Sequence, residues 1–136
     1  MKNLILMMGL PYSGKTTEAR KLNAPIVSPD AIRLALHGER YLGRAEFMVW
    51  PLAVLMVRAL FEAGHERVVV DATHVSRKRR DFWREQGDAD WTIHIREIPT
   101  LAETCVSRAV AVGDHEIVPV IYRMSEEYEH IGGTET

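Results

Sequence analysis

A glycine-rich segment, residues 9–16, has the composition of a phosphate-binding loop. It reads GLPYSGKT and fits the pattern G-x-x-x-x-G-K-[ST], in which backbone N–H groups turn inward and line an anion site. The helix that follows would add its positive N-terminal end. Lys15 would reach the β- and γ-phosphates, and the Thr16 hydroxyl would ligate Mg²⁺. The pattern predicts a nucleoside triphosphate site; the alternative is a glycine-rich turn with a solvated lysine.

Asp71 ends the segment VVVD, whose three β-branched residues predict a strand. At the carboxyl edge of a parallel sheet this carboxylate would act on the metal, directly or through water. Aspartate also ends strands for turn geometry alone, which is the alternative. We expect ATP and Mg²⁺ as cofactors, with Thr16 and Asp71 on the metal. The residues expected to contact the donor are Gly9, Pro11, Tyr12, Ser13, Gly14, Lys15, Thr16 and Thr17.

Asp30 and Arg33 stand three residues apart in SPDAIR, on one face at the start of a predicted helix. Such a helix start lies at the carboxyl edge of the sheet, where ligands bind. There a carboxylate can accept a proton from an attacking hydroxyl, and an arginine can bind an anionic group bidentately. The alternative is a helix-capping Asp30 with an incidental ion pair. Because a phosphate acceptor is already ionised, Asp30 favours an alcohol acceptor.

The segment SRKRRDFWRE carries a run of basic residues on a predicted helix after the strand-end acid. Its first turn would face the active site, with Arg77 nearest the ligand. One hypothesis is a nucleic-acid backbone track with Trp83 available to stack a base. The other, usual for charge runs on helices, is a solvated basic face with Phe82 and Trp83 in the core.

The elements that would position these residues alternate between strand and helix, which predicts an α/β domain with a parallel sheet. Asn3 to Met8 is a continuous apolar run, typical of a strand covered on both faces. Thr100 and Glu103 fit a capping box. We expect further strands near 25–28, 68–71 and 91–98, helices near 14–22, 29–37, 45–63, 76–86, 100–112 and 116–130, a loop over 38–44 and a frayed tail over 131–136.

The composition is that of an ordinary globular domain: 136 residues, 46% hydrophobic and 26% charged. We expect one domain, residues 1–136. A net charge of −2 argues against nucleic-acid binding through overall charge but allows a local basic patch. The single cysteine, Cys105, excludes an intrachain disulfide and fits the cytoplasm. The apolar segment 47–61 is short for a membrane span and contains Pro51 and Arg58, so we expect no membrane association. No obligate protein partner is evident.

Three segments resemble the kinase domain of the polynucleotide 5′-hydroxyl kinase family. They are GLPYSGKTT, SPDAIR, and VVVDATH with the basic helix that follows it. That family belongs to a wider group of small P-loop kinases that includes toxin and antibiotic kinases, and the likeness runs over residues 3–124. It implies the P-loop kinase fold, with a parallel sheet of four to five strands flanked by helices on both faces. It also implies Asp30 as general base, Arg33 on a phosphate of the acceptor, and Lys15, Thr16 and Asp71 on the donor and metal.

The family's lid helix, matched here by about 108–118, usually offers two arginines four residues apart. Arg108 is present, but Val112 stands at the second position. A missing lid arginine loses charge stabilisation worth several powers of ten in rate. Arg108, Arg123 or His115 could substitute. The family also commonly carries asparagine where this chain has His74, which can still form hydrogen bonds.

Together these residues predict an ATP-dependent, Mg²⁺-requiring kinase that transfers a γ-phosphoryl group to a hydroxyl. The best-supported acceptor is the 5′-hydroxyl of DNA or RNA. One alternative is a kinase of a nucleoside, metabolite or antibiotic alcohol, which a closed pocket near Arg33 would favour. The other is an ATP-binding switch or degenerate kinase, which Val112 favours. The expected catalytic residues are Lys15, Asp30, Arg33 and Arg108, and the expected acceptor contacts are Asp30, Arg33 and Arg77.

Overall fold

The computed structural model describes residues 1–40, 46–87, 90–133 and 135. Strands and helices lie close to their expected ranges, while residues 41–44 of the expected loop and residue 45 of the expected long helix lie outside the described residues. The elements are β1 (Asn3–Met8), α1 (Lys15–Arg20), β2 (Ile26–Val27), α2 (Pro29–His37), α3 (Glu46–Glu62), β3 (Arg67–Val70), α4 (Arg77–Gly87), β4 (Thr92–Glu97), α5 (Ala102–Ala111) and α6 (Val118–Glu127).

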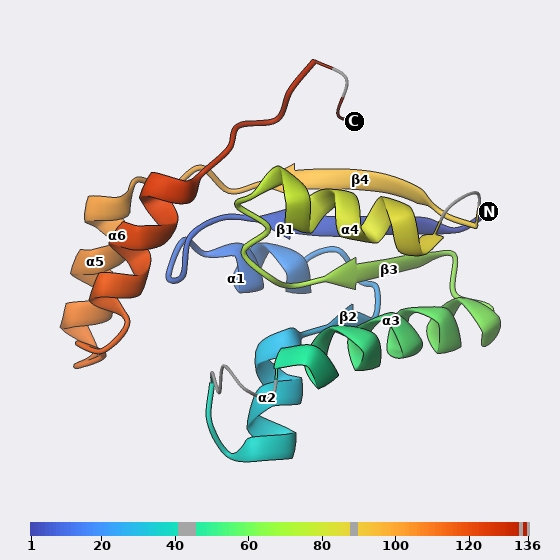
Figure 1. The fold of residues 1–136 in the computed structure, drawn as a ribbon, viewed down its shortest axis with the longest axis horizontal. Helices are drawn as coiled ribbons and strands as arrows, with labels where there is room; N and C mark the ends of the chain where they lie inside the picture. Colours follow the sequence, from blue (N-terminus) through green and yellow to red (C-terminus); the bar gives the residue numbers. More distant parts are fainter. Residues whose placement is uncertain (41–45, 88–89, 134, 136) are drawn as a thin grey trace.

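The described strands form one parallel sheet in the order β2-β3-β1-β4, as Figure 1 shows. β1 lies inside the sheet, where Leu4 stands opposite Val68 of β3 and Ile93 of β4. All the carboxyl ends point toward α5 and α6. The α/β fold with a parallel sheet is therefore confirmed. The order also brings the loops after β1 and β3 side by side at one edge.

Side chains alternate along the strands and sort the core into two layers. Leu6 and Val70 pack on the face covered by residues of α3 and α4. Met7 and Val69 point to the opposite face and pack against Ala19 of α1. Helices therefore cover both faces of the sheet, and β1 and β3 are packed on both sides.

The helices α5 and α6 lie beyond the carboxyl edge and pack on each other (Figure 1). The capping box expected at the start of α5 is wrong. The N-cap residue is Leu101, with no side-chain cap. The Thr100 hydroxyl instead donates to the carbonyl oxygen of Ser13, with an oxygen–oxygen distance of 2.7 Å. Thr100 thus ties the segment before α5 to the glycine-rich loop.

The basic helix α4 places two of its residues in the core. Trp83 is fully buried, so the hypothesis that it stacks a base is wrong and the expectation that it lies in the core is confirmed. The expectation of a solvated basic face is wrong for one of its residues. Arg80 is also fully buried and donates to the carbonyl oxygens of His74 and Glu129. Its remaining partner is the carboxylate of Glu135, at 2.6 and 3.1 Å. Glu135 lies in the tail expected to fray, so that expectation is corrected for this residue.

The buried pair predicts that Glu135 contributes to stability. Glu135→Ala would leave the Arg80 guanidinium without its counter-ion, and breaking a buried ion pair costs about 3–5 kcal/mol. Chemical denaturation should show this loss in the free energy of unfolding. Glu127→Ala is the control, because Glu127 pairs with Arg123 on an exposed helix face at 3.8 Å and such pairs contribute at most about 1 kcal/mol. Equal losses in the two variants would contradict the prediction.

Candidate functional site

The glycine-rich loop joins β1 to α1 through two residues with left-handed backbone. Tyr12 has φ 65° and Gly14 has φ 98°. Gly9 sits where no side chain fits, since a Cβ there would lie 2.6 Å from the Ser13 hydroxyl oxygen and 2.9 Å from the carbonyl oxygen of Ile98. The loop thus has the tight turn and the close packing that an anion-binding nest requires.

Lys15 begins α1 and lies near two carboxylates. Burial lowers the pKa of Lys15, while the charges of Asp71 and Asp30 oppose that shift. The lysine is therefore the positive charge between the strand-end acid and the acid at the start of α2. A bound triphosphate would give this partly desolvated ammonium a strong counter-ion.

The Thr16 hydroxyl and Asp71 meet at the carboxyl edge. Thr16 Oγ1 donates to Asp71 Oδ2 at 2.7 Å. The second carboxylate oxygen, Oδ1, is buried and has no hydrogen-bond partner among the described residues. Mg²⁺ prefers oxygen ligands and is usually held by one or two protein groups together with substrate phosphates and water. A hydroxyl beside an unpaired carboxylate oxygen fits this cation.

The start of α2 carries Asp30 but is capped by another residue. Ser28 Oγ accepts the backbone N–H of Ala31 at 3.1 Å, so the alternative of a capping Asp30 is wrong. Asp30 is largely exposed and accepts one hydrogen bond from Arg33 Nη1 at 2.6 Å. Its carboxylate is therefore available to a ligand in the adjoining cavity.

Arg33 is held on its other side by Glu46, the first residue of α3. Arg33 donates to both Glu46 oxygens, at 2.8 and 2.6 Å. These hydrogen bonds and the charges of Glu46 and Asp30 outweigh burial and raise the pKa of Arg33, and Arg33 in turn lowers the pKa of Glu46. The sequence-based reasoning missed Glu46, because it is 13 residues from Arg33 and no short motif links them.

The basic helix contributes Arg79 to the site in place of the expected Arg77. The Arg79 guanidinium lies 3.8 Å from the ring centroid of Trp50, a cation–π contact. Arg79 lines the cavity described below, whereas Arg77 does not and pairs with Asp81 at 3.4 Å. We expected Arg77 to be the basic residue of α4 nearest the ligand. That expectation is corrected, because Arg79 and not Arg77 lines the cavity.

The lid contributes Arg108 but not Val112. Arg108 Nη1 donates to the carbonyl oxygen of Tyr12 at 3.0 Å, alongside the glycine-rich loop. Val112 follows the last residue of α5, is 69% exposed and does not line the cavity. Arg123 of α6 does line it.

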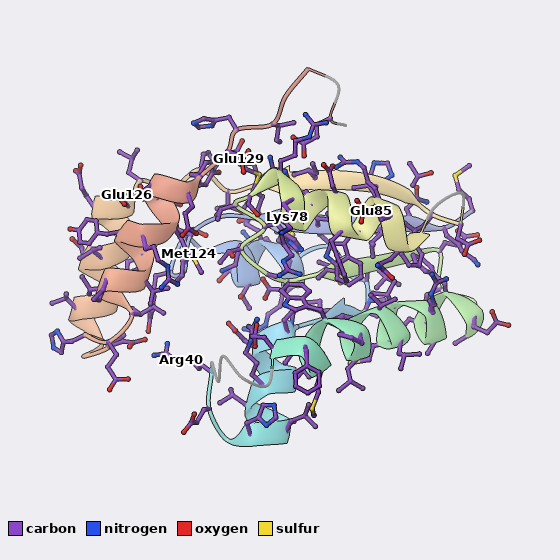
Figure 2. The ribbon with its side chains drawn as sticks, in the orientation of Figure 1. Arg40, Lys78, Glu85, Met124, Glu126 and Glu129 are labelled. Atoms are coloured by element: carbon purple, nitrogen blue, oxygen red, sulfur yellow. The ribbon has the colours of Figure 1, made fainter. Side chains whose placement is uncertain are left out.

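One cavity of about 1260 Å³ joins these groups. It exceeds the roughly 300–1,000 Å³ of typical small-ligand sites, so it can hold a triphosphate and part of a second substrate. Figure 2 shows Arg40 and Met124, both lining residues, near α2 and on α6. Gly9 and Ser13 do not line the cavity. The expected site residues that line the cavity are Pro11, Tyr12, Gly14, Lys15, Thr16, Thr17, Asp30, Arg33, Asp71 and Arg108.

The parallel sheet, the glycine-rich loop and the strand-end acid define the fold of a P-loop kinase. The chain belongs to the AAA_33 family, an AAA domain, whose profile matches residues 4–120. No curated protein matched the sequence. Over the described residues, no helix has the length and apolar character of a membrane span.

Solved structures with this fold include both a nucleic-acid repair assembly and small-molecule kinases. A chain of the Pnkp1/Rnl/Hen1 complex is 25% identical with a TM-score of 0.71, over 79% of this chain and 38% of that one. A sugar kinase from Janibacter sp. HTCC2649 is 18% identical with a TM-score of 0.74, over 100% and 83%. A gluconokinase from Sinorhizobium meliloti 1021 is 22% identical with a TM-score of 0.59, over 97% and 78%. This chain therefore spans well under half of the Pnkp1-complex chain.

Gly9→Ala tests the packing of the glycine-rich loop. The added Cβ would force the loop away from Ile98, and overpacking of this kind costs about 1–3 kcal/mol. If 1.4 kcal/mol of this strain falls on the nucleotide-bound form, ATP affinity drops about tenfold. Calorimetric titration with ATP and Mg²⁺ should show this loss. Gly133→Ala is the control, since a Cβ there meets nothing within 4 Å. Wild-type affinity in Gly9→Ala would contradict the prediction.

Proposed function

We propose that the protein is an ATP- and Mg²⁺-dependent kinase that phosphorylates a hydroxyl, and that its acceptor is the 5′-hydroxyl of a nucleic acid. The observation that carries the proposal is the shared cavity. A carboxylate suited to act as base, Asp30, and a complete phosphate loop with Lys15 line the same space. Binding of ATP alone would not require Asp30 there.

The donor side is supported by the phosphate loop and its neighbours. Backbone N–H groups of the loop and the N-terminus of α1 would hold the phosphates, and Lys15 would bind the β- and γ-phosphates. Thr16 and Asp71 would hold Mg²⁺, which supplies charge neutralisation to the phosphates when bound. Arg108, bonded to the loop at Tyr12, would add positive charge on the lid side.

The acceptor side is supported by Asp30 and its arginine. The acceptor oxygen would attack the γ-phosphorus while the bond from that phosphorus to the bridging β–γ oxygen breaks. The electron pair of the broken bond leaves with ADP, and the hydroxyl proton passes to the Asp30 carboxylate. The hydrogen bond from Arg33 holds that carboxylate in place.

Two observations favour a nucleic-acid acceptor. Arg33 and Arg79 bring positive charge to the acceptor side, and Trp50 lies beside them. Phosphates of a strand are neutralised by arginines, and aromatic rings accommodate bases. Among the similar structures, the 25% identical chain belongs to a complex that is described as an RNA repair complex.

One observation favours a small-molecule alcohol as a second candidate. Arg33 is already engaged by both oxygens of Glu46 and by Asp30. An acceptor phosphate would have to displace one of these carboxylates, whereas an uncharged alcohol would not. The sugar kinase and the gluconokinase with this fold are consistent with that candidate.

An acceptor panel separates the candidates. The protein would receive γ-labelled ATP and Mg²⁺ with 5′-hydroxyl RNA, 5′-hydroxyl DNA, nucleosides, gluconate and simple sugars. We expect label on the 5′ end of an oligonucleotide and not on the same strand with a 5′-phosphate. Label on small alcohols alone would overturn the nucleic-acid acceptor. If the protein bound ATP but labelled no acceptor, the remaining candidate would be a nucleotide-binding switch without transfer activity.

Asp30→Asn tests the base. The amide cannot accept the proton, and loss of a general base costs about 10²–10⁴-fold in rate. Single-turnover transfer should fall by that factor while ATP affinity stays near wild type. Asp90→Asn is the matched control, since Asp90 is also exposed and also pairs with an arginine, Arg58, at 3.2 Å. Wild-type transfer by Asp30→Asn would exclude it as the base.

A further inference from the structure

Arg40 is held at the cavity by the loop between α5 and α6. Its Nη1 and Nη2 donate to the two oxygens of Asp114, at 2.7 and 3.0 Å. The Tyr12 hydroxyl donates to the same carboxylate at 2.7 Å. Three segments that are distant in sequence, the glycine-rich loop, the end of α2 and the lid, therefore meet at one carboxylate.

The pairing leaves much of the Arg40 guanidinium available. A guanidinium has five N–H donors in a planar fork, and the two hydrogen bonds to Asp114 use one edge of it. The Arg40 side chain is 45% exposed, and the residue lines the same cavity as Lys15 and Asp30. Asp114 and, more weakly, the charge of Asp30 raise the pKa of Arg40, so it stays charged and within electrostatic reach of the base.

The transferred phosphoryl group needs positive charge on the acceptor side as well as on the loop side. Charge spreads over its equatorial oxygens in the transition state, and an arginine there is worth several powers of ten in rate. Lys15 and Arg108 belong to the loop side. Arg33 is held by Glu46 and Asp30. Arg123 is 62% exposed and pairs with Glu127 on its own helix. Arg79 lies against the Trp50 ring. Of these arginines, Arg40 alone is linked to the glycine-rich loop from the acceptor side, through Asp114 and Tyr12.

We propose that Arg40 is a catalytic residue that binds the transferred phosphoryl group, and that Asp114 is the residue that positions it. This inference rests on the proposed kinase function. When the γ-phosphorus leaves the bridging oxygen and bonds to the acceptor oxygen, Arg40 donates hydrogen bonds to the equatorial oxygens and keeps all its protons. Asp114, which accepts the Tyr12 hydroxyl as well, holds the guanidinium in place. Val112, outside the cavity, has no part in this step.

The test compares ADP with ADP plus aluminium fluoride and Mg²⁺, the latter an analogue of the transferred group that needs no acceptor. The variants are Arg40→Ala, Arg40→Gln and Asp114→Asn. The matched control is Arg58→Ala, because Arg58 is 44% exposed and also pairs with an aspartate from another segment. We expect Arg40→Ala and Arg40→Gln to weaken the fluoride complex about 100-fold or more while ADP affinity stays near wild type. Transfer should fall about 10³-fold.

Asp114→Asn distinguishes a catalytic role of Arg40 from a purely structural role of its ion pair with Asp114. A positioning residue predicts a smaller loss than in Arg40→Ala, because the arginine is still present. Equal losses in Asp114→Asn and Arg40→Ala, shared equally by ADP and the fluoride complex, would mean that the pair only closes the cavity and would overturn the inference. If the wild-type protein bound ADP with aluminium fluoride and Mg²⁺ no more tightly than ADP alone, the kinase proposal itself would be overturned. The Arg40→Gln variant keeps the test valid if Arg40→Ala fails to fold.

Discussion

The parallel pairing of β1 with β3 is the constraint on which the site depends. It places the residue after Val70 beside the loop that follows Met8, and so brings Asp71 Oδ2 within 2.7 Å of the Thr16 hydroxyl. Gly9 N donates to the carbonyl oxygen of Thr73 at 2.9 Å, which continues the contact beyond the strands. A one-residue shift in this register would turn every side chain of β1 to the other face. The register therefore fixes both the packing of the core and the contact between Thr16 and Asp71.

A second set of contacts supports the same edge from behind. His74, whose φ is 47°, bonds through Nδ1 to the carbonyl oxygen of Met7 at 2.6 Å and accepts the Trp83 indole N–H at its Nε2. Since Nε2 accepts, the proton of the neutral ring lies on Nδ1. Burial lowers the pKa of His74 to about 4, so the ring stays neutral. A histidine at this position can therefore link β1, the loop after β3 and α4 without bringing a charge into the core.

Much of the fold, and the part of the candidate site formed by the glycine-rich loop and Asp71, could be predicted from the sequence because their signals are local. The β-branched run before Asp71, the apolar run of β1 and the spacing within residues 9–16 each lie within a few residues. Glu46, Asp114 and Glu135 could not be found in this way. Each acts through an arginine 13, 74 or 55 residues away, and only the tertiary fold brings those partners together.

The prediction that Arg77, and not Arg79, lies nearest the ligand was wrong for a related reason. Both lie on the first turn of α4, and periodicity does not say which side of that turn faces the cavity. Arg80, one residue further on, is drawn fully into the core by Glu135 and two carbonyl groups. That anchor fixes the rotation of the helix and leaves Arg79 against Trp50. A buried ion pair with the tail thus decides which arginine reaches the site.

Three of the arginines that line the cavity have carboxylate partners in the structure, and this affects how a phosphorylated ligand could bind. Arg33 pairs with Asp30 and Glu46, Arg40 with Asp114, and Arg123 with Glu127. A triphosphate adds several negative charges, so these arginines must share or exchange partners as it binds. The pair of Arg123 with Glu127 is exposed on both sides, so water screens it and it can exchange at little cost. The pairs of Arg33 are less exposed and resist exchange more strongly. Of these carboxylates, Glu46 is therefore the one that a ligand would displace least readily, so an anionic group would bind Arg33 most easily if it left the contact with Glu46 intact.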